Sequence, residues 1–266
     1  MHDCFIGIDV AFAKRKRLPM VVCAWEGERL VPYPLRTIPI EPPRGFGNVS
    51  AVDLASVLGF AEGAKEYILR ICEYFGTTPV RIAIDAPSSP TSEGLRRRAA
   101  EKAMDEAGIS CFTTPSEDQW LKIRERVADH LAAGGAHSRL PHANQLWMLP
   151  GFQLFKTLNK VAPCLKVFPQ AIARELGVGG VHKSKREGVT AQIRSAARYT
   201  GWPAGAQEEA ILSKIAWAPR HDCLDAYLSA WVAALEEHER VPYGIPPGDV
   251  IWVPKCGALR QRINCA

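Results

Sequence analysis

Four aspartates in three separate stretches of the chain have the setting of metal-binding carboxylates. Asp9 and Asp85 each stand at the end of a short apolar run that is rich in β-forming residues. Such runs are typical of buried strands, in which a charge is costly unless it is paired or bound to a metal. Asp222 and Asp225 lie three residues apart at the start of a predicted helix, so their side chains emerge near one another.

The pair on the predicted helix also has a purely structural interpretation. An aspartate that caps a helix and a second acid in the first turn both interact favourably with the helix dipole, without any metal. The sequence leaves Asp222 as either a second ligand or the cap, whereas Asp225, directly before Ala226, is the stronger ligand. Two acids at strand ends are harder to explain in this way, and they favour a shared site.

The first third of the chain has the pattern of a three-stranded meander, followed by a helix and a fourth strand. The strands are expected at residues 4–11, 18–25, 29–38 and 80–87, and the helix from a start at 50–53 towards residue 75. A strand–helix–strand crossover implies that the fourth strand runs parallel to the earlier part of the sheet. Asp9 and Asp85 would then emerge at the same carboxyl edge, where open α/β sheets place their sites.

The remainder of the chain predicts mainly helices. We expect a basic helix at 93–107, a helical insertion around 116–160, a strand at 165–169, helices at 170–176, 206–217 and 220–235, a Pro-rich segment at 242–247 and a strand at 250–253. The helix at 220–235 shows one apolar face, and the small residues Ala226 and Ala230 would let it approach a sheet closely. Together these elements predict an α/β fold with a mixed sheet, in a single domain spanning residues 1–266.

The composition excludes several classes of protein. The 266 residues are 47% hydrophobic, as in ordinary globular proteins, and the formal net charge of +5 permits a polyanionic partner without requiring one. The eight cysteines lack the spacing of a zinc site or a disulfide framework, which suits a reducing compartment. The sequence shows neither a signal-peptide pattern nor an apolar run long enough to span a membrane, so we expect a soluble, cytoplasmic protein without a membrane partner.

The order of the acidic motifs resembles that of the ribonuclease H-like superfamily. Residues 7–11 (Gly-Ile-Asp-Val-Ala) resemble the first-strand motif of its Holliday-junction resolvase and transposase branch, and residues 222–226 resemble the D-x-x-D-A turn of the same enzymes. The chain is also similar, over roughly residues 5–253, to the predicted-nuclease family known as domain of unknown function 429. The pieces that carry this second resemblance are residues 7–9, 83–87, 96–98, 167–171, 183–188 and the final acidic helix.

The resemblance implies a nuclease that hydrolyses phosphodiester bonds of a nucleic acid with two hard cations, Mg²⁺ or Mn²⁺. The implied metal ligands are Asp9, Asp85, Asp222 and Asp225. The candidate contacts to substrate phosphates are Lys183, Lys185, Arg97 and His221. Glu93 is a reserve ligand, whereas Gln170 stands where the family often carries a glutamate and Ala99-Ala100-Glu101 where it often carries an aspartate.

Two other functions stay open at this point. A non-catalytic nucleic-acid-binding or scaffold protein on the same fold would hold its acids too far apart to share a metal. An actin-like or sugar-kinase-like phosphotransferase would cradle phosphate with small residues directly after the first acid, but Asp9 is followed by Val-Ala-Phe-Ala. The sequence also leaves open whether the substrate is DNA, RNA or a nucleotide, and which oligomer the chain forms.

Overall fold

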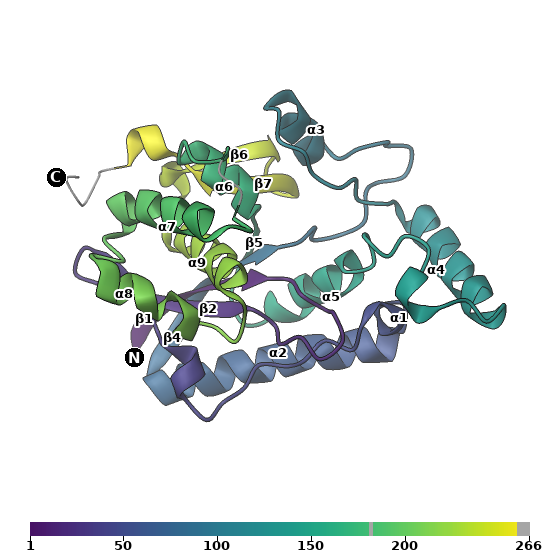
Figure 1. Cartoon of the computed structure of the whole chain (residues 1–266). Helices are drawn as coiled ribbons and strands as arrows, with labels where there is room; N and C mark the ends of the chain where they lie inside the picture. The colour runs from purple at the N-terminus through teal and green to yellow at the C-terminus, as the bar shows by residue number, and fades with distance from the viewer. Residues whose placement is uncertain (181–182, 260–266) are drawn as a thin grey trace.

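A five-stranded mixed sheet lies at the centre of the computed structural model, which describes residues 1–180 and 183–259 (Figure 1). The strands, in the order β3-β2-β1-β4-β5 across the sheet, are β3 (Arg29–Pro32), β2 (Met20–Glu26), β1 (His2–Asp9), β4 (Thr77–Asp85) and β5 (Cys164–Lys166). The first three pair antiparallel, while β4 and β5 run parallel to β1. The predicted α/β class with a mixed sheet is confirmed, and the order is consistent with a ribonuclease H-like arrangement.

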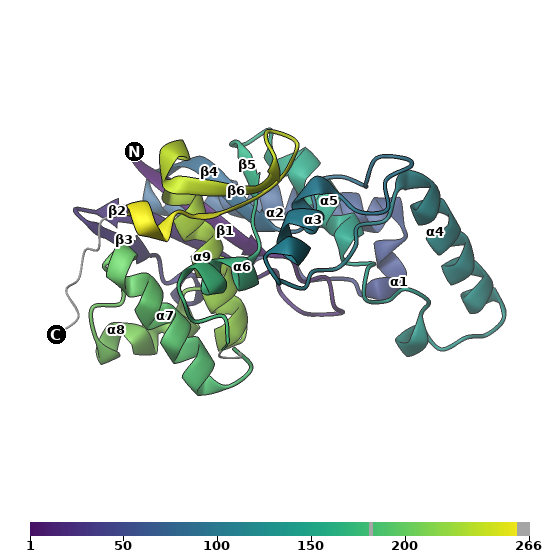
Figure 2. The ribbon, with the colours of Figure 1, turned by 90° about the horizontal axis from the view of Figure 1, so that it is seen from above.

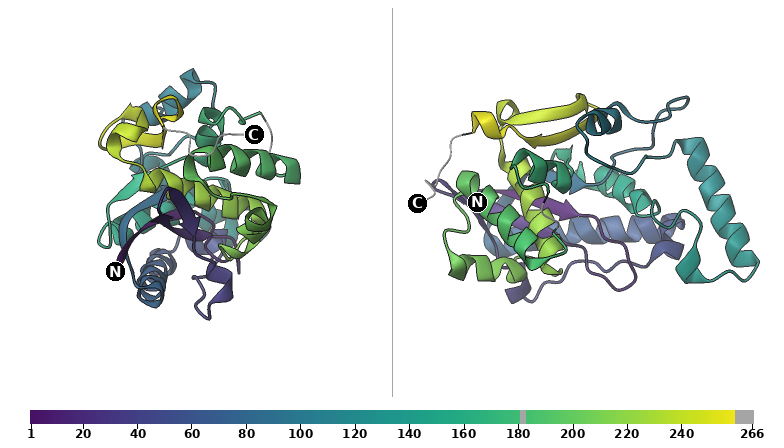
Figure 3. Two further views of the ribbon diagram at one scale, coloured as in Figure 1. Left: turned by 90° about the vertical axis from the view of Figure 1, so that its left-hand side faces the viewer. Right: turned by 45° about the horizontal axis from the view of Figure 1, so that its top comes forward.

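Helices cover both faces of the sheet (Figures 1 and 3). One face packs against α2 (Leu54–Phe75) and α5 (Met148–Leu158), and the other against α9 (Arg220–Ala234), with α6 (Pro169–Glu175) and α7 (Arg186–Thr200) outside it. The strand residues alternate between these two cores, because successive side chains of a strand point to opposite faces. Cys4 and Ile6 join the α2 core, whereas Phe5 between them joins the α9 core.

The crossover helix α2 begins and ends where its sequence predicts. Asp53 caps its first turn by accepting a hydrogen bond from the Ser56 amide at 2.8 Å. Gly76 ends it in the left-handed conformation, with φ of 65°, which glycine adopts without steric penalty. This helix carries the chain from the end of the meander back to the start of β4, so that β4 pairs parallel with β1.

Helix α9 differs from its prediction. Every residue from Asp222 to Ala234 is buried, so the expectation of a helix with one apolar face and one exposed face is wrong. The reason is its position between the sheet and helices α6 and α7, which leaves no side of it in water. A helix enclosed on all sides carries small and apolar residues all round.

Several predicted elements are shorter than expected, and one was missed. The third strand stops at Pro32 and is followed by the 3₁₀ turn Leu35–Thr37, and the basic helix is reduced to α3 (Ala99–Glu106). The Pro-rich segment after α9 is itself a strand, β6 (Arg240–Ile245), and it pairs antiparallel with β7 (Asp249–Pro254). Proline is tolerated there because each strand of a two-stranded ribbon has a free edge.

The other helices complete the molecule. They are α1 (Asn48–Ala51), α4 (Glu117–Ala132) and α8 (Ala206–Ile211), with the 3₁₀ turns His137–Arg139, Leu212–Lys214, Glu237–Glu239 and Cys256–Ala258. Figure 2 shows α4 at one end of the molecule, away from the sheet. No helix within the described residues is both long and apolar enough to cross a membrane.

Candidate metal centre

Asp9 and Asp85 lie side by side at the carboxyl ends of the two central strands. They are register partners in the parallel pairing of β1 with β4, in which each residue from Phe5 to Asp9 faces one residue of β4. The three residues before each acid, 6–8 in β1 and 82–84 in β4, are apolar or glycine and buried, so each acid ends an uncharged stretch. The parallel register therefore places two carboxylates next to each other at the edge that the sequence indicates.

Helix α9 brings a third acid to the same place because it packs directly on β1. A Cβ atom at Gly7 would stand 1.9 Å from the carbonyl oxygen of Ala226 and 2.3 Å from the amide nitrogen of Ala230. Backbone therefore meets backbone, as the small residues of this helix predict. Gly7 comes two residues before Asp9, and Ala226 directly follows Asp225, so this contact holds the helix acid beside the strand acids.

The three acids form a cluster in which the negative charge of the carboxylates exceeds the positive charge of the nearby lysines. Burial raises the pKa of Asp9 well above its ordinary value, and the neighbouring carboxylates of Asp225, Asp85 and Asp222 raise it further. Burial, followed by the charge of Asp225, raises the pKa of Asp85 to about 7, although two lysines oppose this shift. Buried like charges of this kind favour either a shared proton or a bound cation.

Lys183 supplies the positive charge nearest to this cluster. Its Nζ donates to Oδ2 of Asp225, while Oδ1 of Asp225 is buried and accepts no hydrogen bond from any described residue. Burial lowers the pKa of Lys183, but Asp225, Asp85 and Asp9 together raise it above its ordinary value. Burial raises the pKa of Asp225, and Lys183 opposes that shift. The ammonium group thus stands where a cation would neutralise the acids.

Asp222 lies in the first turn of α9 and does not act as its cap. The N-cap residue is Pro219, and no side chain caps the helix by a hydrogen bond. Asp222 instead pairs with Lys16 Nζ at 2.6 Å and with His221 Nε2 at 3.0 Å. Of the two interpretations that the sequence allowed, the helix cap is therefore wrong, and Asp222 is a buried acid with its own partners.

The candidate phosphate contacts have different surroundings. Lys183 and His221 lie beside the acids, as described above, and Lys185 is exposed at the N-cap position of α7. Arg97 is engaged within its own region, since it pairs with Asp105 at 3.1 Å and donates to the Cys111 carbonyl at 3.3 Å. The reserve ligand Glu93 is exposed and accepts from the Asp118 amide at 3.2 Å.

Sequence reasoning missed Lys166 at the end of β5. It is the register partner of Ile84, the residue before Asp85, and both Lys166 and Asp85 line a small cavity of about 40 Å³. Burial, with the nearby charge of Arg98, lowers the pKa of Lys166 to about 8. Lys166, like Asp9, is a charged residue at the end of a short strand, and this sequence pattern identifies it as a candidate site residue.

The donor set of the centre suits a hard divalent cation. Three carboxylates offer only oxygen ligands, which Mg²⁺ and Mn²⁺ prefer, and Oδ1 of Asp225 is a buried acceptor that lacks a donor. Within the described residues, no three histidine, cysteine, aspartate or glutamate side chains already stand close enough together to hold a metal ion. The arrangement is therefore that of a carboxylate cluster whose positive charge comes from Lys183.

No curated protein and no solved structure is significantly similar to the chain. A family model described as "Protein of unknown function (DUF429)" matches residues 7–247, which contain Asp9, Asp85, Asp222 and Asp225. This match covers β2 to β5, the carboxyl end of β1 and α9, and therefore the carboxylate cluster that they form. The chain therefore belongs to the DUF429 family.

Proposed function

We propose that the protein is a metal-dependent nuclease that hydrolyses phosphodiester bonds. The observation that carries this proposal is the juxtaposition of Asp9, Asp85 and Asp225 at one sheet edge, with pKa values raised by burial and by neighbouring carboxylates. A fold gains no stability from gathering buried like charges, so such a cluster is a candidate for a functional site.

The three acids would hold the cation, Mg²⁺ or Mn²⁺. When bound, divalent cations supply an activated water and stabilise the leaving oxygen of a phosphodiester. Asp9 is central because it lies between Asp85 on the neighbouring strand and Asp225 on the helix that packs over β1. Asp222 contributes negative charge from the next turn, and its pairing with Lys16 and His221 fixes its side chain.

Lys183 would change partners when a cation binds. Its present contact with Asp225 neutralises one carboxylate and occupies one of its two oxygens. A divalent cation offers more positive charge than the ammonium, so it would displace Lys183 from Asp225. The released ammonium and the imidazole of His221 would then lie at the rim of the cluster, where they can neutralise and position a substrate phosphate.

A second candidate is a non-catalytic nucleic-acid-binding protein on the same fold. The observation that favours it is the Lys183–Asp225 pair, which already neutralises part of the cluster, together with the lack of a ready-made group of ligands among the described residues. In that case the acids would be a structural ion-pair network, and nucleic acid would bind without being cleaved.

The experiment that separates the two candidates measures cleavage of labelled DNA and RNA with Mg²⁺, with Mn²⁺ and with EDTA. We expect metal-dependent cleavage by the wild type and a loss of at least about 100-fold in Asp9→Asn and Asp225→Asn. Asp3→Asn is the matched control, because Asp3 lies on the same strand but is exposed. Binding without metal-dependent cleavage in the wild type, or equal cleavage by the wild type and Asp9→Asn, would overturn the nuclease proposal.

A further inference from the structure

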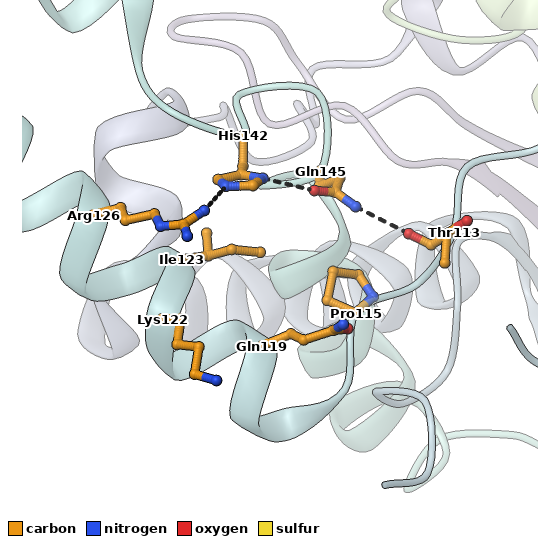
Figure 4. Close-up of a pocket in the computed structure, with 8 residues that line it drawn as sticks. All are labelled: Thr113, Pro115, Gln119, Lys122, Ile123, Arg126, His142 and Gln145. Atoms are coloured by element: carbon orange, nitrogen blue, oxygen red, sulfur yellow. Dashed lines mark hydrogen bonds between the residues drawn. The ribbon is translucent and has the colours of Figure 1, made fainter. Parts of the chain in front are cut away.

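A second site with the character of an anion pocket lies along α4, apart from the carboxylate cluster. This pocket, of about 390 Å³, is formed by α4, the turn before α5 and the segment that precedes α4 (Figure 4). Its polar lining comes from Lys122, Arg126, His142, Gln145 and Gln119, and no aspartate or glutamate lines it. Its volume lies in the range of sites for small ligands.

The polar groups of the pocket form a chain of hydrogen bonds with a single direction. Arg126 Nη1 lies 3.2 Å from His142 Nε2, and an arginine can only donate, so this ring nitrogen accepts. The proton of the neutral imidazole is therefore on Nδ1, which donates to Gln145 Oε1 at 3.2 Å. Gln145 Nε2 in turn donates to the Thr113 carbonyl at 3.1 Å (Figure 4). These hydrogen bonds hold the His142 ring and the Arg126 guanidinium in place, and no negatively charged group takes part in them.

Two side chains of the pocket, Lys122 and Arg126, carry a positive charge and are exposed. Lys122 and Arg126 lie one turn apart on the same side of α4, and neither forms an ion pair with any described residue. Two cations beside each other repel, and a bound anion would remove that repulsion. Arg126 currently donates to a neutral imidazole, which is a weaker acceptor than an oxyanion.

The backbone holds His142 in place for such a ligand. Its φ of 54° lies in the left-handed region, which is uncommon for a residue other than glycine. The Gln145 amide donates to the His142 carbonyl at 2.8 Å and closes the turn around it. A side chain that is fixed in this way loses little freedom when it binds a ligand, and non-glycine residues in this conformation concentrate at ligand sites.

The pocket shares a wall with the cavity that contains Asp85. Thr113 and Pro115 line the pocket, while Phe112 and Thr114, which alternate with them, line the cavity beside Asp85. A similar arrangement holds around the start of α5, where Gln145 lines the pocket, and Trp147 and Met148 line the cavity. The pocket and the cavity that Asp85 lines thus lie on two sides of the same segment, 112–115, and a linear ligand that crosses this segment would pass from one to the other.

We propose that this pocket binds a phosphate group of a nucleic-acid strand whose neighbouring nucleotides lead to the carboxylate cluster. A guanidinium, an ammonium and amide groups around one hollow are donors that bind phosphate oxygens, and the His142 ring holds the guanidinium in place. The proposal rests on the nucleic-acid part of the proposed function, but it does not depend on cleavage.

The test measures the affinity of the full-length protein for labelled single-stranded DNA, single-stranded RNA and duplex DNA, in EDTA and between about 50 and 200 mM salt. The variant is Lys122→Met with Arg126→Met. The control is Lys102→Met with Lys160→Met, which removes two exposed positive charges elsewhere. We expect the pocket variant to bind at least one of the three probes about 10-fold more weakly, with a smaller salt dependence, and the control to bind like the wild type.

Two results would overturn the proposal. The first is equal affinity of the pocket variant and the control for every strand tested. The second is that no strand binds, but inorganic phosphate or a mononucleotide shifts the NMR resonances of the His142 ring, which are assigned with the His142→Gln variant. The ligand would then be a small phosphorylated molecule. The cleavage assay shows which of the two proposals fails. If the pocket variant binds and cleaves nucleic acid as the wild type does, only the proposal about the pocket is refuted. Strand binding that depends on Lys122 and Arg126, without cleavage, refutes only the nuclease.

Discussion

Gly7 of β1 lies so close to Ala226 of α9 that the helix backbone rests on the strand. A methyl group at residue 7 would stand 1.9 Å from the Ala226 carbonyl oxygen, far inside van der Waals contact. The contact is what allows an acid near the end of the chain to join two acids of the sheet. The geometry of the carboxylate cluster thus depends on a residue that carries no side chain.

Gly7→Ala is expected to destabilise the fold and to move Asp225 away from Asp9. The backbone atoms of α9 cannot yield as a flexible side chain would, so the helix must shift, and overpacking of this kind costs about 2 kcal/mol or more. Urea denaturation measures the free energy of unfolding. Gly59→Ala is the matched control, because a methyl group at this position in α2 meets no atom within 4 Å, and we expect it to be neutral or slightly stabilising.

Asp85→Asn is expected to change how stability depends on pH. The pKa of Asp85 is about 7 in the fold, against 3.8 for an ordinary aspartate, so between these pH values the folded chain keeps a proton that the unfolded chain has lost. The free energy of unfolding of the wild type therefore falls as the pH rises through this window. Asparagine does not titrate, so the stability of the variant relative to the wild type should rise by roughly 2–4 kcal/mol across it.

The measurement for Asp85 is urea denaturation in EDTA at about pH 4 and about pH 7. Asp3→Asn, on the same strand as Asp9 but exposed, should leave the pH dependence of stability unchanged. A difference between Asp85→Asn and wild type that stays constant with pH would show that Asp85 has an ordinary pKa, and that the carboxylate cluster does not retain a proton there.

Lys183→Met is expected to strengthen the binding of Mn²⁺. The ammonium of Lys183 holds Oδ2 of Asp225, so a metal must displace it, and its removal also leaves the cluster more negative. An increase in affinity of about 10-fold corresponds to about 1.4 kcal/mol and is measurable by titration calorimetry. Lys185→Met serves as the control, since Lys185 is exposed two residues further along. Weaker binding by Lys183→Met than by Lys185→Met would show that Lys183 does not occupy the place of a cation.

The strand part of the site could be predicted from sequence because few physical rules decide it. A short apolar run that ends in an acid is a buried strand with a charge at its edge, and one crossover helix makes two such strands parallel. Asp9 and Asp85 follow from these rules alone, and the family match confirms the resemblance to domain of unknown function 429.

The helix part of the site could be predicted only in outline. The small residues of α9 indicate a close approach to the sheet, but the periodicity of its apolar residues indicates an exposed face that does not exist. The periodicity of apolar residues predicts a helix with one buried and one exposed face. A helix that is covered on one side by the sheet and on the other by helices has no exposed face. The pairing of Lys183 with Asp225 depends on where α7 begins relative to α9, which no local pattern determines.

The order of the strands and of α9 along the chain also has a consequence for synthesis. β1 and β4 can pair as soon as residue 85 has emerged from the ribosome, but α9 docks on Gly7 only after residues 220–234 have emerged as well. A truncated product that ends before α9 carries two of the three acids and lacks the helix that covers them. The carboxylate cluster is thus completed only after α9 has been made, and a fragment released before then would not contain a complete site.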